Sequence, residues 1–437
     1  MSVVAKADLS TLELPVPRHV AASGAVTSGI ETAGAGTPAA LQRLASLDAF
    51  RGLVMVLMVS AGLRIGDVVR NFERTPELQH LKTPLWERLA YQTDHAPWVG
   101  CSLWDLIQPS FMFMVGTALA FSVASRRAKG QTFTRMLGHA VLRAALLSYL
   151  GIFLISNWSK SPDWSFVVVL TQIGLGYVFL FLLAWVRPRW QFASAMGILV
   201  LYWGAFALYP KPAPHVDLAS VNLPSDWKRL EGFASHWEKN QNMAAALDRW
   251  FLNLFPRNDG KPFTFNSGGY QTLNFVPSLA TMIFGLLAGE LIRGRLSAAA
   301  KFWILLGCGL AGLGVGWVLD RAGICPIVKR IWTPSWTIFS AGWAFLLLAI
   351  FYLIVDIGRI RFWAWPLLVV GMNSIAAYCM SMILRPWVRD NINRHFGHGV
   401  YEIFGKAYAP MVDATLFLIF CWLVCWWMYR QKMFIRI

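Results

Sequence analysis

Apolar runs of membrane-spanning length recur along this chain, and they constrain its fold more than any other feature. About ten such stretches, each of roughly 20 residues, could cross the hydrocarbon core of a bilayer as helices. A soluble domain could not bury this surface, since 56% of the residues are hydrophobic and the mean hydropathy is +0.49. We therefore predict an all-α polytopic membrane protein. The spans are centred near Met55, Val115, Leu147, Tyr177, Val200, Ile283, Leu310, Phe345, Asn373 and Phe420.

Basic residues in the short connections predict the orientation of these spans. The segments "SRRAKGQTFTR", "RPRW", "RGRLSAAAK" and "DIGRIR" and the tail "YRQKMFIRI" all fall on one side if both termini are cytoplasmic. This distribution accounts for the net charge of +16. The sequence shows no base-stacking module and no isolated basic domain. The expected partner is therefore the lipid bilayer, not nucleic acid.

The chain divides into a polar tail and a membrane domain. Residues 1–42 are rich in Ala, Gly, Ser, Thr and Pro, which predicts a disordered cytoplasmic tail before a membrane domain at 43–437. Three longer connections, at 67–101, 210–271 and 386–410, are expected outside. Residues Glu238 to Phe251 of the middle one could form a surface helix that caps a cavity, contacts a partner or simply connects two spans.

Several polar residues lie inside or at the ends of the predicted spans, where they are costly. Asp48 and Arg51 share a helical face and can pair, either as an interfacial ion pair or as part of a site. Asp105 precedes Pro109, so it either caps the second span or orients a neighbouring imidazole. Three further polar residues could hydrogen-bond to other helices or line a ligand cavity. They are Gln172, Asn373 and Ser374.

Six motifs occur in an order that resembles a known family. They are "RLASLDAFRGLVMVLMV", "HAPWVGCSLWDLIQPSFMFMVGTAL", "LTQIGLGY", "PSLATMIFGLLAGELIR", "WTPSWTIFSAGWAFLLLAIFYLI" and "GMNSIAAY". Together they resemble the membrane acyltransferase family of heparan-α-glucosaminide N-acetyltransferase and its bacterial relatives, over nearly the whole chain from Arg43 onward. The resemblance implies a multi-span enzyme of a bacterial inner membrane. It would move an acetyl group from cytosolic acetyl-CoA to an amino sugar or envelope glycan on the far side.

The resemblance assigns the active histidine to the "HAPWVG" element, which makes His95 the catalytic candidate. The loop count independently places His95 outside, at the entrance to the second span. Histidine could deprotonate the acceptor or carry the acetyl group itself, and the sequence leaves both routes open. Asp105 is the expected orienting carboxylate, whereas the adjacent Asp94 is expected to be solvated. Trp98 belongs to the same element and is a candidate substrate contact.

The remaining assignments concern the two substrates. Gln172, Asn373 and Ser374 are candidate donors to the thioester oxyanion. Arginines on the cytoplasmic side are candidates for the phosphates of CoA, although orientation alone explains most of them. They are Arg51, paired with Asp48 in the family element, and Arg126, Arg127, Arg135 and Arg143.

Some features depart from the family or stay open. The family has an Asn-containing pair at the end of its first conserved span, where this chain has Ala61 and Gly62. Some relatives have been called sugar transporters, so an inner-membrane carrier of N-acetylglucosamine type is the alternative. Nothing in the cysteine and histidine spacing predicts a metal site. The sequence also leaves open a homodimer and a bridge between Cys101 and Cys325.

Overall fold

The computed structural model describes residues 44–213, 216–257 and 260–435. The predicted tail at 1–42 lies outside these ranges, so its disorder and its location stay predictions. Within the described ranges the chain is helical and has no β-strand, only an isolated antiparallel bridge between Val99 and Val328. The prediction of an all-α membrane protein is confirmed.

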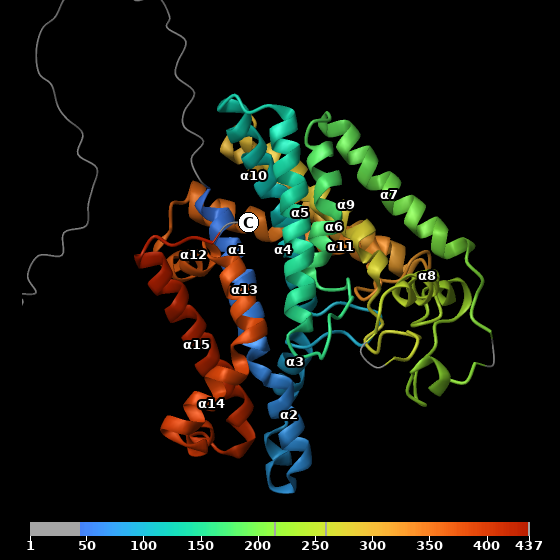
Figure 1. Ribbon diagram of the computed structural model, residues 1–437, viewed down its shortest axis with the longest axis vertical. Helices are drawn as coiled ribbons and strands as arrows, with labels where there is room; N and C mark the ends of the chain where they lie inside the picture. Colours follow the sequence, from blue (N-terminus) through green and yellow to red (C-terminus); the bar gives the residue numbers. More distant parts are fainter. Residues whose placement is uncertain (1–43, 214–215, 258–259, 436–437) are drawn as a thin grey trace, which may run out of the picture. The chain divides into compact units, whose positions relative to one another are not determined.

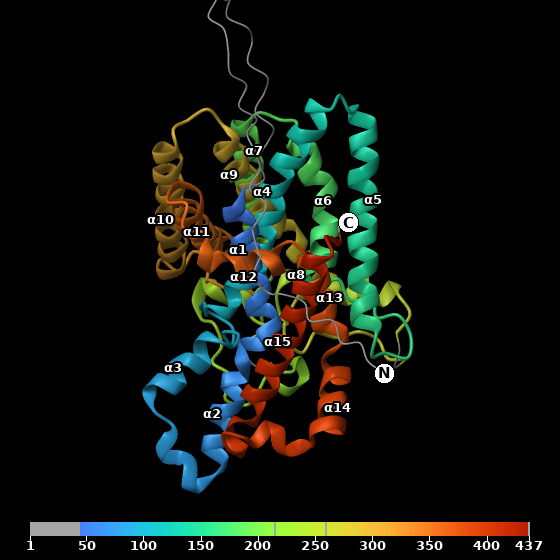
Figure 2. The ribbon, with the colours of Figure 1, turned by 90° about the vertical axis from the view of Figure 1, so that its left-hand side faces the viewer.

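Eight helices in the described ranges are long and apolar enough to cross a membrane. Figures 1 and 2 show them as a bundle of long helices, with α3 (Pro84–Gln92) and α14 (Arg385–Phe396) toward one end. The first span bends where α1 meets α2. The helices are α1 (Ala45–Ser60) continued by α2 (Ile65–Arg74), α4 (Ile107–Ala128), α5 (Phe133–Ser156), α7 (Pro188–Leu208), α9 (Phe275–Arg293), α10 (Ala298–Arg321), α11 (Pro334–Phe351) and α15 (Ala409–Arg430).

The two other predicted spans are irregular. Helices α12 (Trp365–Gly371) and α13 (Ser374–Ile383) are bent by 66° at a short break, and together they make a ninth candidate span. Helix α6 (Val169–Leu183) has 15 residues, fewer than the ~20 of a straight crossing. Each predicted centre falls on one of these helices, except Asn373, which lies at the break. The structure thus has eight or nine spans by length and composition where the sequence indicates about ten.

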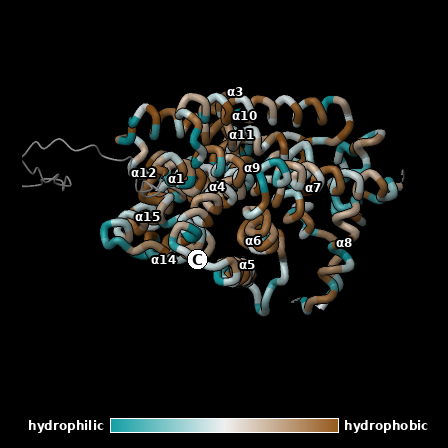
Figure 3. Tube along the Cα trace, turned by 90° about the horizontal axis from the view of Figure 1, so that it is seen from above, coloured by the Kyte–Doolittle hydropathy of each residue, from teal (hydrophilic) through white to brown (hydrophobic). Residues whose placement is uncertain are grey.

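Close packing of small residues holds the centre of the bundle together. A Cβ atom at Gly116 of α4 would overlap the carbonyl oxygen of Met282 in α9, and one at Gly285 of α9 would overlap that of Phe113 in α4. Such contacts suit helices in lipid, where van der Waals packing drives association. Helix α10 is peripheral, with only 17% of its apolar window buried. Several of its large hydrophobic residues are exposed, and Figure 3 shows that this helix and its neighbours are mostly hydrophobic.

The connections that the sequence predicts to be extracytoplasmic meet at one end of the bundle. The Trp98 indole N–H donates to the Trp237 carbonyl (3.1 Å), and Val99 pairs with Val328. Trp164, between α5 and α6, stacks on Phe255 with ring centroids 5.2 Å apart. Four connections therefore form one layer, at 93–103, 157–168, 209–271 and 322–333. That this layer is outside the cell stays a prediction.

The described residues of the longest connection are partly buried. The expected surface helix at Glu238–Phe251 begins later, as α8 (Met243–Phe251), because Asn242 caps it by accepting a hydrogen bond from the Ala245 N–H (3.0 Å). Glu238 precedes the helix as a fully buried residue. It accepts hydrogen bonds from the Trp227 indole and the Leu230 N–H. This connection is therefore a packed layer over the bundle and not a solvated connector.

Candidate active site

His95 lies on an irregular loop between α3 (Pro84–Gln92) and the 3-10 turn Trp104–Leu106 that leads into α4. The loop is held from the opposite side by the connection between α10 and α11. The Gly100 N–H donates to the Ile327 carbonyl (2.9 Å), next to the bridge between Val99 and Val328. Two segments more than 220 residues apart in sequence therefore enclose the histidine.

Asp105 closes the histidine loop into a compact turn. Its Oδ2 atom accepts hydrogen bonds from the Ala96 N–H (3.1 Å), the Ser102 N–H (3.1 Å) and the Ser102 hydroxyl (3.0 Å). The side chain of Asp105 is 1% exposed. Three donors on one oxygen stabilise the ionised carboxylate, because a carboxylate only accepts hydrogen bonds.

The other carboxylate oxygen of Asp105 binds the imidazole of His95. Nδ1 of His95 lies 2.7 Å from Oδ1 of Asp105. Because the ionised carboxylate cannot donate, we infer that Nδ1 carries the proton and that Nε2 is an acceptor. The side chain of His95 is 34% exposed, and its Nε2 makes no hydrogen bond to the residues that the structure describes. The predicted pairing of His95 with Asp105 is therefore present, and Asp94 is exposed as expected.

Lys329 is a third member of this site that the sequence interpretation missed. Its Nζ lies 3.2 Å from Oδ1 of Asp105, to which it donates, and 3.0 Å from Nδ1 of His95, which cannot accept a hydrogen bond from it while Nδ1 carries the proton. Its side chain is 6% exposed, and this burial lowers the pKa of the ammonium although Asp105 opposes the effect. The sequence did contain a signal that could have found Lys329. Lys329 and Arg330 are adjacent basic residues in a connection on the side opposite the basic loops, so they are an exception to the charge distribution that predicts the orientation.

Aromatic and basic residues surround the exposed edge of His95. The ring of Tyr270 meets the imidazole edge-on, with centroids 6.5 Å apart. Arg330 lies over the ring of Tyr270 (5.5 Å) and donates to the Gly268 carbonyl (2.7 Å). Trp98, a predicted substrate contact, is instead 5% exposed and packs with Trp227. Its contacts support the loop.

The predicted polar residues of the spans take part in other hydrogen bonds. Oε1 of Gln172 accepts a hydrogen bond from Gln108 (3.2 Å), which is on α4 one turn after Asp105. Oδ1 of Asn373, at the break before Ser374, accepts from the Ile435 N–H (3.3 Å). The amide nitrogens of Gln172 and Asn373 are buried without a hydrogen-bond partner among the described residues. No hydrogen bond joins Gln172, Asn373 or Ser374 to His95 in the described structure.

Two features of α1 bear on the family motif. Arg51 and Asp48 form the predicted ion pair (3.3 Å) within α1. The chain then turns left-handed at Ala61 and Gly62, where the family has its Asn-containing pair. Gly62 has φ of +61°, and a Cβ atom there would lie 2.7 Å from the carbonyl oxygen of Thr93. The end of α1 therefore packs against the residue two positions before His95.

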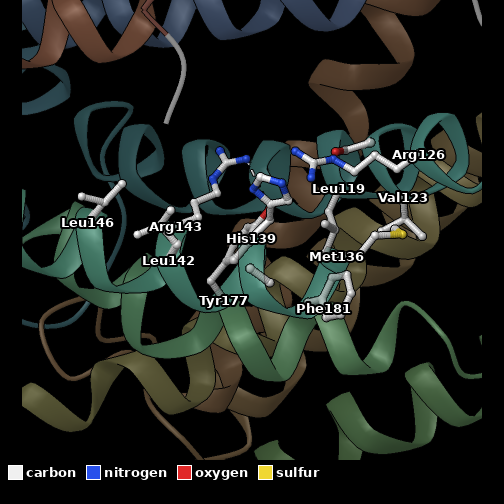
Figure 4. Close-up of a pocket in the computed structure, with 12 residues that line it drawn as sticks. Leu119, Val123, Arg126, Met136, His139, Leu142, Arg143, Leu146, Tyr177 and Phe181 are labelled. Carbon is white, nitrogen blue, oxygen red and sulfur yellow. Dashed lines mark hydrogen bonds between the residues drawn. The ribbon is translucent and has the colours of Figure 1, made fainter. Parts of the chain in front are cut away.

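The predicted CoA-binding arginines come from α1, α4 and α5, and they do not all lie together. Arg126, Arg143 and His139 line a pocket of about 100 Å³ between α4, α5 and α6 (Figure 4). Arg143 donates to the Tyr177 hydroxyl (3.2 Å) and lies over its ring. Arg127 points elsewhere and lies over the ring of Trp185 (4.9 Å). The structure thus brings two of the predicted arginines together. Arg135, in the first turn of α5, and Arg51 do not line this pocket.

Thiol chemistry has weak support near His95. Cys101 and Cys325 are free thiols on the two paired segments, so the bridge that the sequence left open is absent. Burial raises the pKa of Cys101 to about 12 and that of Cys325 to about 11, which disfavours a thiolate nucleophile. Among the described residues, no group of three or more His, Cys, Asp or Glu side chains could hold a metal ion.

Comparison with known proteins confirms the resemblance that the motifs indicated. The chain is similar to the heparan-alpha-glucosaminide N-acetyltransferases of Homo sapiens and Mus musculus, with 22% identity to each. The matches cover 90% and 86% of this chain but 60% and 59% of the relatives. The chain thus spans about 60% of the length of the curated relatives it matches. No family model matches it.

Proposed function

We propose that this membrane protein is an acyltransferase that moves an acetyl group from acetyl-CoA to an amino sugar or envelope glycan. The observation that carries this proposal is the pairing of Asp105 with His95, which leaves Nε2 of the imidazole as an acceptor at a partly exposed edge. We place the reaction in a bacterial inner membrane. Acetyl-CoA would come from the cytosol, and the acceptor would be on the far side. These details rest on the motif resemblance and on the basic loops.

In a direct transfer, His95 acts as a general base. Nε2 takes a proton from the acceptor amine as the amine nitrogen attacks the thioester carbonyl carbon. The C–S bond then breaks, and the CoA sulfur leaves with its electron pair and takes the proton from the imidazolium. Asp105 keeps Nδ1 protonated and stabilises the transient positive charge, because its Oδ1 lies 2.7 Å from Nδ1.

In a carrier route, His95 is the nucleophile. Nε2 attacks the thioester carbonyl carbon, the C–S bond breaks, and CoA leaves as a thiolate with the electron pair. The acceptor amine then attacks the carbonyl carbon of the acetyl-imidazole, and Nε2 is restored with its electron pair. The amine loses one proton in this step, which balances the proton that the CoA thiolate takes from water. Both routes need the same tautomer, in which Nδ1 is protonated and Nε2 is free. The contacts of Asp105 therefore support both and do not distinguish between them.

The rest of acetyl-CoA can be assigned to two sets of residues. Arg126 and Arg143 in the Figure 4 pocket offer positive charge for its phosphates. The unpartnered amide nitrogens of Gln172 and Asn373 are buried donors that could hydrogen-bond to its polar arm inside the bundle. We propose these two residues, with Ser374, as contacts of the donor substrate and not of the reacting histidine.

Acetyl transfer by purified protein tests the proposal. Radiolabelled acetyl-CoA and glucosamine should give labelled N-acetyl product with the wild type. His95→Ala should lower the rate by at least about a hundredfold, as loss of a general base does. The matched control is His80→Ala, because His80 is exposed in the connection that leads to α3. Uptake of intact sugar by proteoliposomes without CoA, together with no acetylated product, would overturn the proposal in favour of transport.

Isotope exchange separates the two routes. If His95 carries the acetyl group, labelled CoA should enter acetyl-CoA in the absence of any acceptor, and the exchange should disappear in His95→Ala. A direct transfer needs both substrates on the enzyme, so it should give no such exchange. The measurement requires only purified protein and the two forms of CoA.

A further inference from the structure

A groove between four of the spanning helices is lined by apolar residues. Its volume is about 430 Å³, within the range of ligand pockets, which are roughly 300–1,000 Å³. The helices are α7, α9, α10 and α11, which lie next to one another in Figure 2. Small side chains leave the space between them open. The small lining residues are Ala288, Ala311, Gly312, Ala341 and Gly342.

The groove is open toward the surface of the bundle and closed toward its centre. On its walls, Phe192 of α7 and Val315 of α10 are about half exposed. On its floor, Ala288 of α9 and Ala341 of α11 are buried. Only 17% of the apolar window of α10 is buried, so this side of the protein faces lipid in a bilayer. Lipid tails are as apolar as these side chains, and a hydrocarbon chain is therefore the natural occupant of the groove.

The dimensions of the groove fit one acyl chain of one leaflet. Its lining residues on α10 run from Ile304 to Val315, about 16 Å at 1.5 Å per residue and half of a hydrocarbon core of about 30 Å. A volume of about 430 Å³ over that length gives a cross-section of about 27 Å². A helix with its side chains has a diameter of 10–12 Å and needs roughly 80–110 Å². The groove is therefore too narrow for a helix of a second copy and wide enough for an extended chain.

Two basic residues lie at one end of the groove, on the side of the basic loops. Arg189 precedes Phe192 by one turn of α7, and Lys301 precedes Ile304 by one turn of α10. Each therefore shares a helical face with a lining residue. Neither side chain forms an ion pair or a hydrogen bond with the residues that the structure describes. Orientation requires basic residues in these loops, but it does not require them on the two faces that border a groove.

We propose that this groove binds a phospholipid with an anionic headgroup. One acyl chain lies along the groove, and the phosphate binds Arg189 and Lys301 at its end. The bound chain fills the space between α7 and the peripheral helix α10. The groove shares no lining residue with the Figure 4 pocket, and His95 does not line it. Its test is therefore independent of acetyl transfer.

Photolabelling of the full-length protein in proteoliposomes tests the position of the chain. The probe is phosphatidylglycerol with a diazirine in one acyl chain, added in small amount to vesicles of phosphatidylcholine. Peptide mass spectrometry should locate the label on the residues that line the groove. Ala311→Trp places a bulky ring in the groove and should lower this labelling by at least about tenfold. The matched control is Leu310→Trp, at an exposed position of α10 that does not line the groove.

Two double variants test the headgroup. Arg189→Gln with Lys301→Gln should lower the labelling by at least about tenfold, because each basic residue near an anionic headgroup adds to its binding. The matched control is Lys129→Gln with Arg135→Gln, which removes two exposed charges from another basic loop and leaves the groove unchanged. Size-exclusion profiles confirm that each variant is folded.

The proposal fails if the labelling does not depend on the groove or on the charges. If Ala311→Trp is labelled like the wild type, the chain does not lie in the groove. If a phosphatidylcholine probe labels the groove as strongly and the charge variants have no effect, the groove takes any lipid of the bilayer and the anionic assignment is wrong. If the purified wild type is a dimer and Ala311→Trp alone makes it a monomer, a second copy occupies the groove.

Discussion

Replacing Asp105 by Asn should separate the structural and chemical roles of this carboxylate. Both oxygens of Asp105 act as acceptors: Oδ1 faces His95 and Lys329, and Oδ2 faces three donors from Ala96 and Ser102. An amide has only one acceptor oxygen. Whichever way the Asn side chain is oriented, its NH₂ group must meet N–H or ammonium donors on one side. The substitution is nearly isosteric, yet it cannot satisfy this set of contacts.

The expected losses follow from these contacts. Removing the negative charge leaves the buried ammonium of Lys329 uncompensated, and breaking a buried pair in this way costs about 3–5 kcal/mol. Deprotonation of Lys329, whose pKa burial already lowers, would reduce this cost. The rate of acetyl transfer should fall by about 10²–10⁴-fold, because an amide NH₂ facing Nδ1 favours the tautomer with its proton on Nε2.

A double variant distinguishes the loss of stability from the loss of activity. Asp105→Asn combined with Lys329→Met lets the amide oxygen face Ala96 and Ser102 while its NH₂ donates to Nδ1 of His95. The double variant should recover at least about 2 kcal/mol of stability relative to the sum of the single variants. It should remain inactive, because Nε2 stays protonated. Denaturant unfolding in detergent and acetyl-transfer rates measure both quantities. Wild-type stability together with a rate within threefold of wild type in Asp105→Asn would refute the reasoning.

Three further predictions concern other parts of the chain. Gly62→Ala should destabilise the protein and slow acetyl transfer, because Gly62 combines φ of +61° with close contact to Thr93. Gly130→Ala shares the strain (φ +70°) but meets nothing within 4 Å, so it should cost only about 1 kcal/mol and leave the rate unchanged. Burial raises the pKa of Asp248 to about 6, so its contribution to stability is present below about pH 4 and is lost as the pH rises through 6, about 3 kcal/mol in total. Asp248→Asn should abolish this loss in unfolding experiments from pH 4 to 7, and an unchanged pH profile would argue against a buried carboxylate. Arg143→Ala should raise the KM for acetyl-CoA by at least about tenfold, whereas Arg189→Ala, an exposed arginine at the start of α7, should not.

Hydropathy was sufficient to predict the class of fold but not the shape of every span. Composition reports how apolar a segment is, and α6 and the α12–α13 pair are apolar throughout. It does not report where a helix begins or bends. The bend at Asn373 depends on neighbouring helices that accommodate a broken backbone, and these are remote in sequence. Similarly, Asn242 determines where α8 begins, a local capping effect that the broad polarity of the loop obscured.

In the candidate site, too, the sequence could predict some contacts and not others. His95 and Asp105 lie ten residues apart in one motif, so the sequence could associate them. Lys329 is 234 residues away from His95, and only tertiary packing brings its ammonium to the same carboxylate. The position of Trp98 illustrates the opposite error. Membership of a functional motif suggested a substrate contact, whereas its buried ring and its bond to Trp237 support the loop that presents His95.

The distance between the proposed sites for the phosphates and for the thioester of acetyl-CoA limits the mechanism. Asp105 and Arg126 are 21 residues apart along one helical segment, about 32 Å at 1.5 Å per residue and close to the thickness of the hydrocarbon core. Arg143 lies deeper, ten residues into α5, which leaves about 20 Å to the end of that helix near the layer of His95. Phosphates bound at Arg143 and a thioester at His95 therefore require the CoA arm to extend inside the bundle.

Proteoliposomes with acetyl-CoA on one side only test this geometry. Turnover should require acetyl-CoA on the side of the basic loops, with a KM that depends on Arg143. If acetyl-CoA on the side of His95 supports the same rate and Arg143→Ala has no effect on KM, the donor does not cross the bundle. In that case the Figure 4 pocket has the chemistry of an anionic lipid headgroup site, because it holds two arginines, and CoA must approach His95 from the layer of connections that contains it.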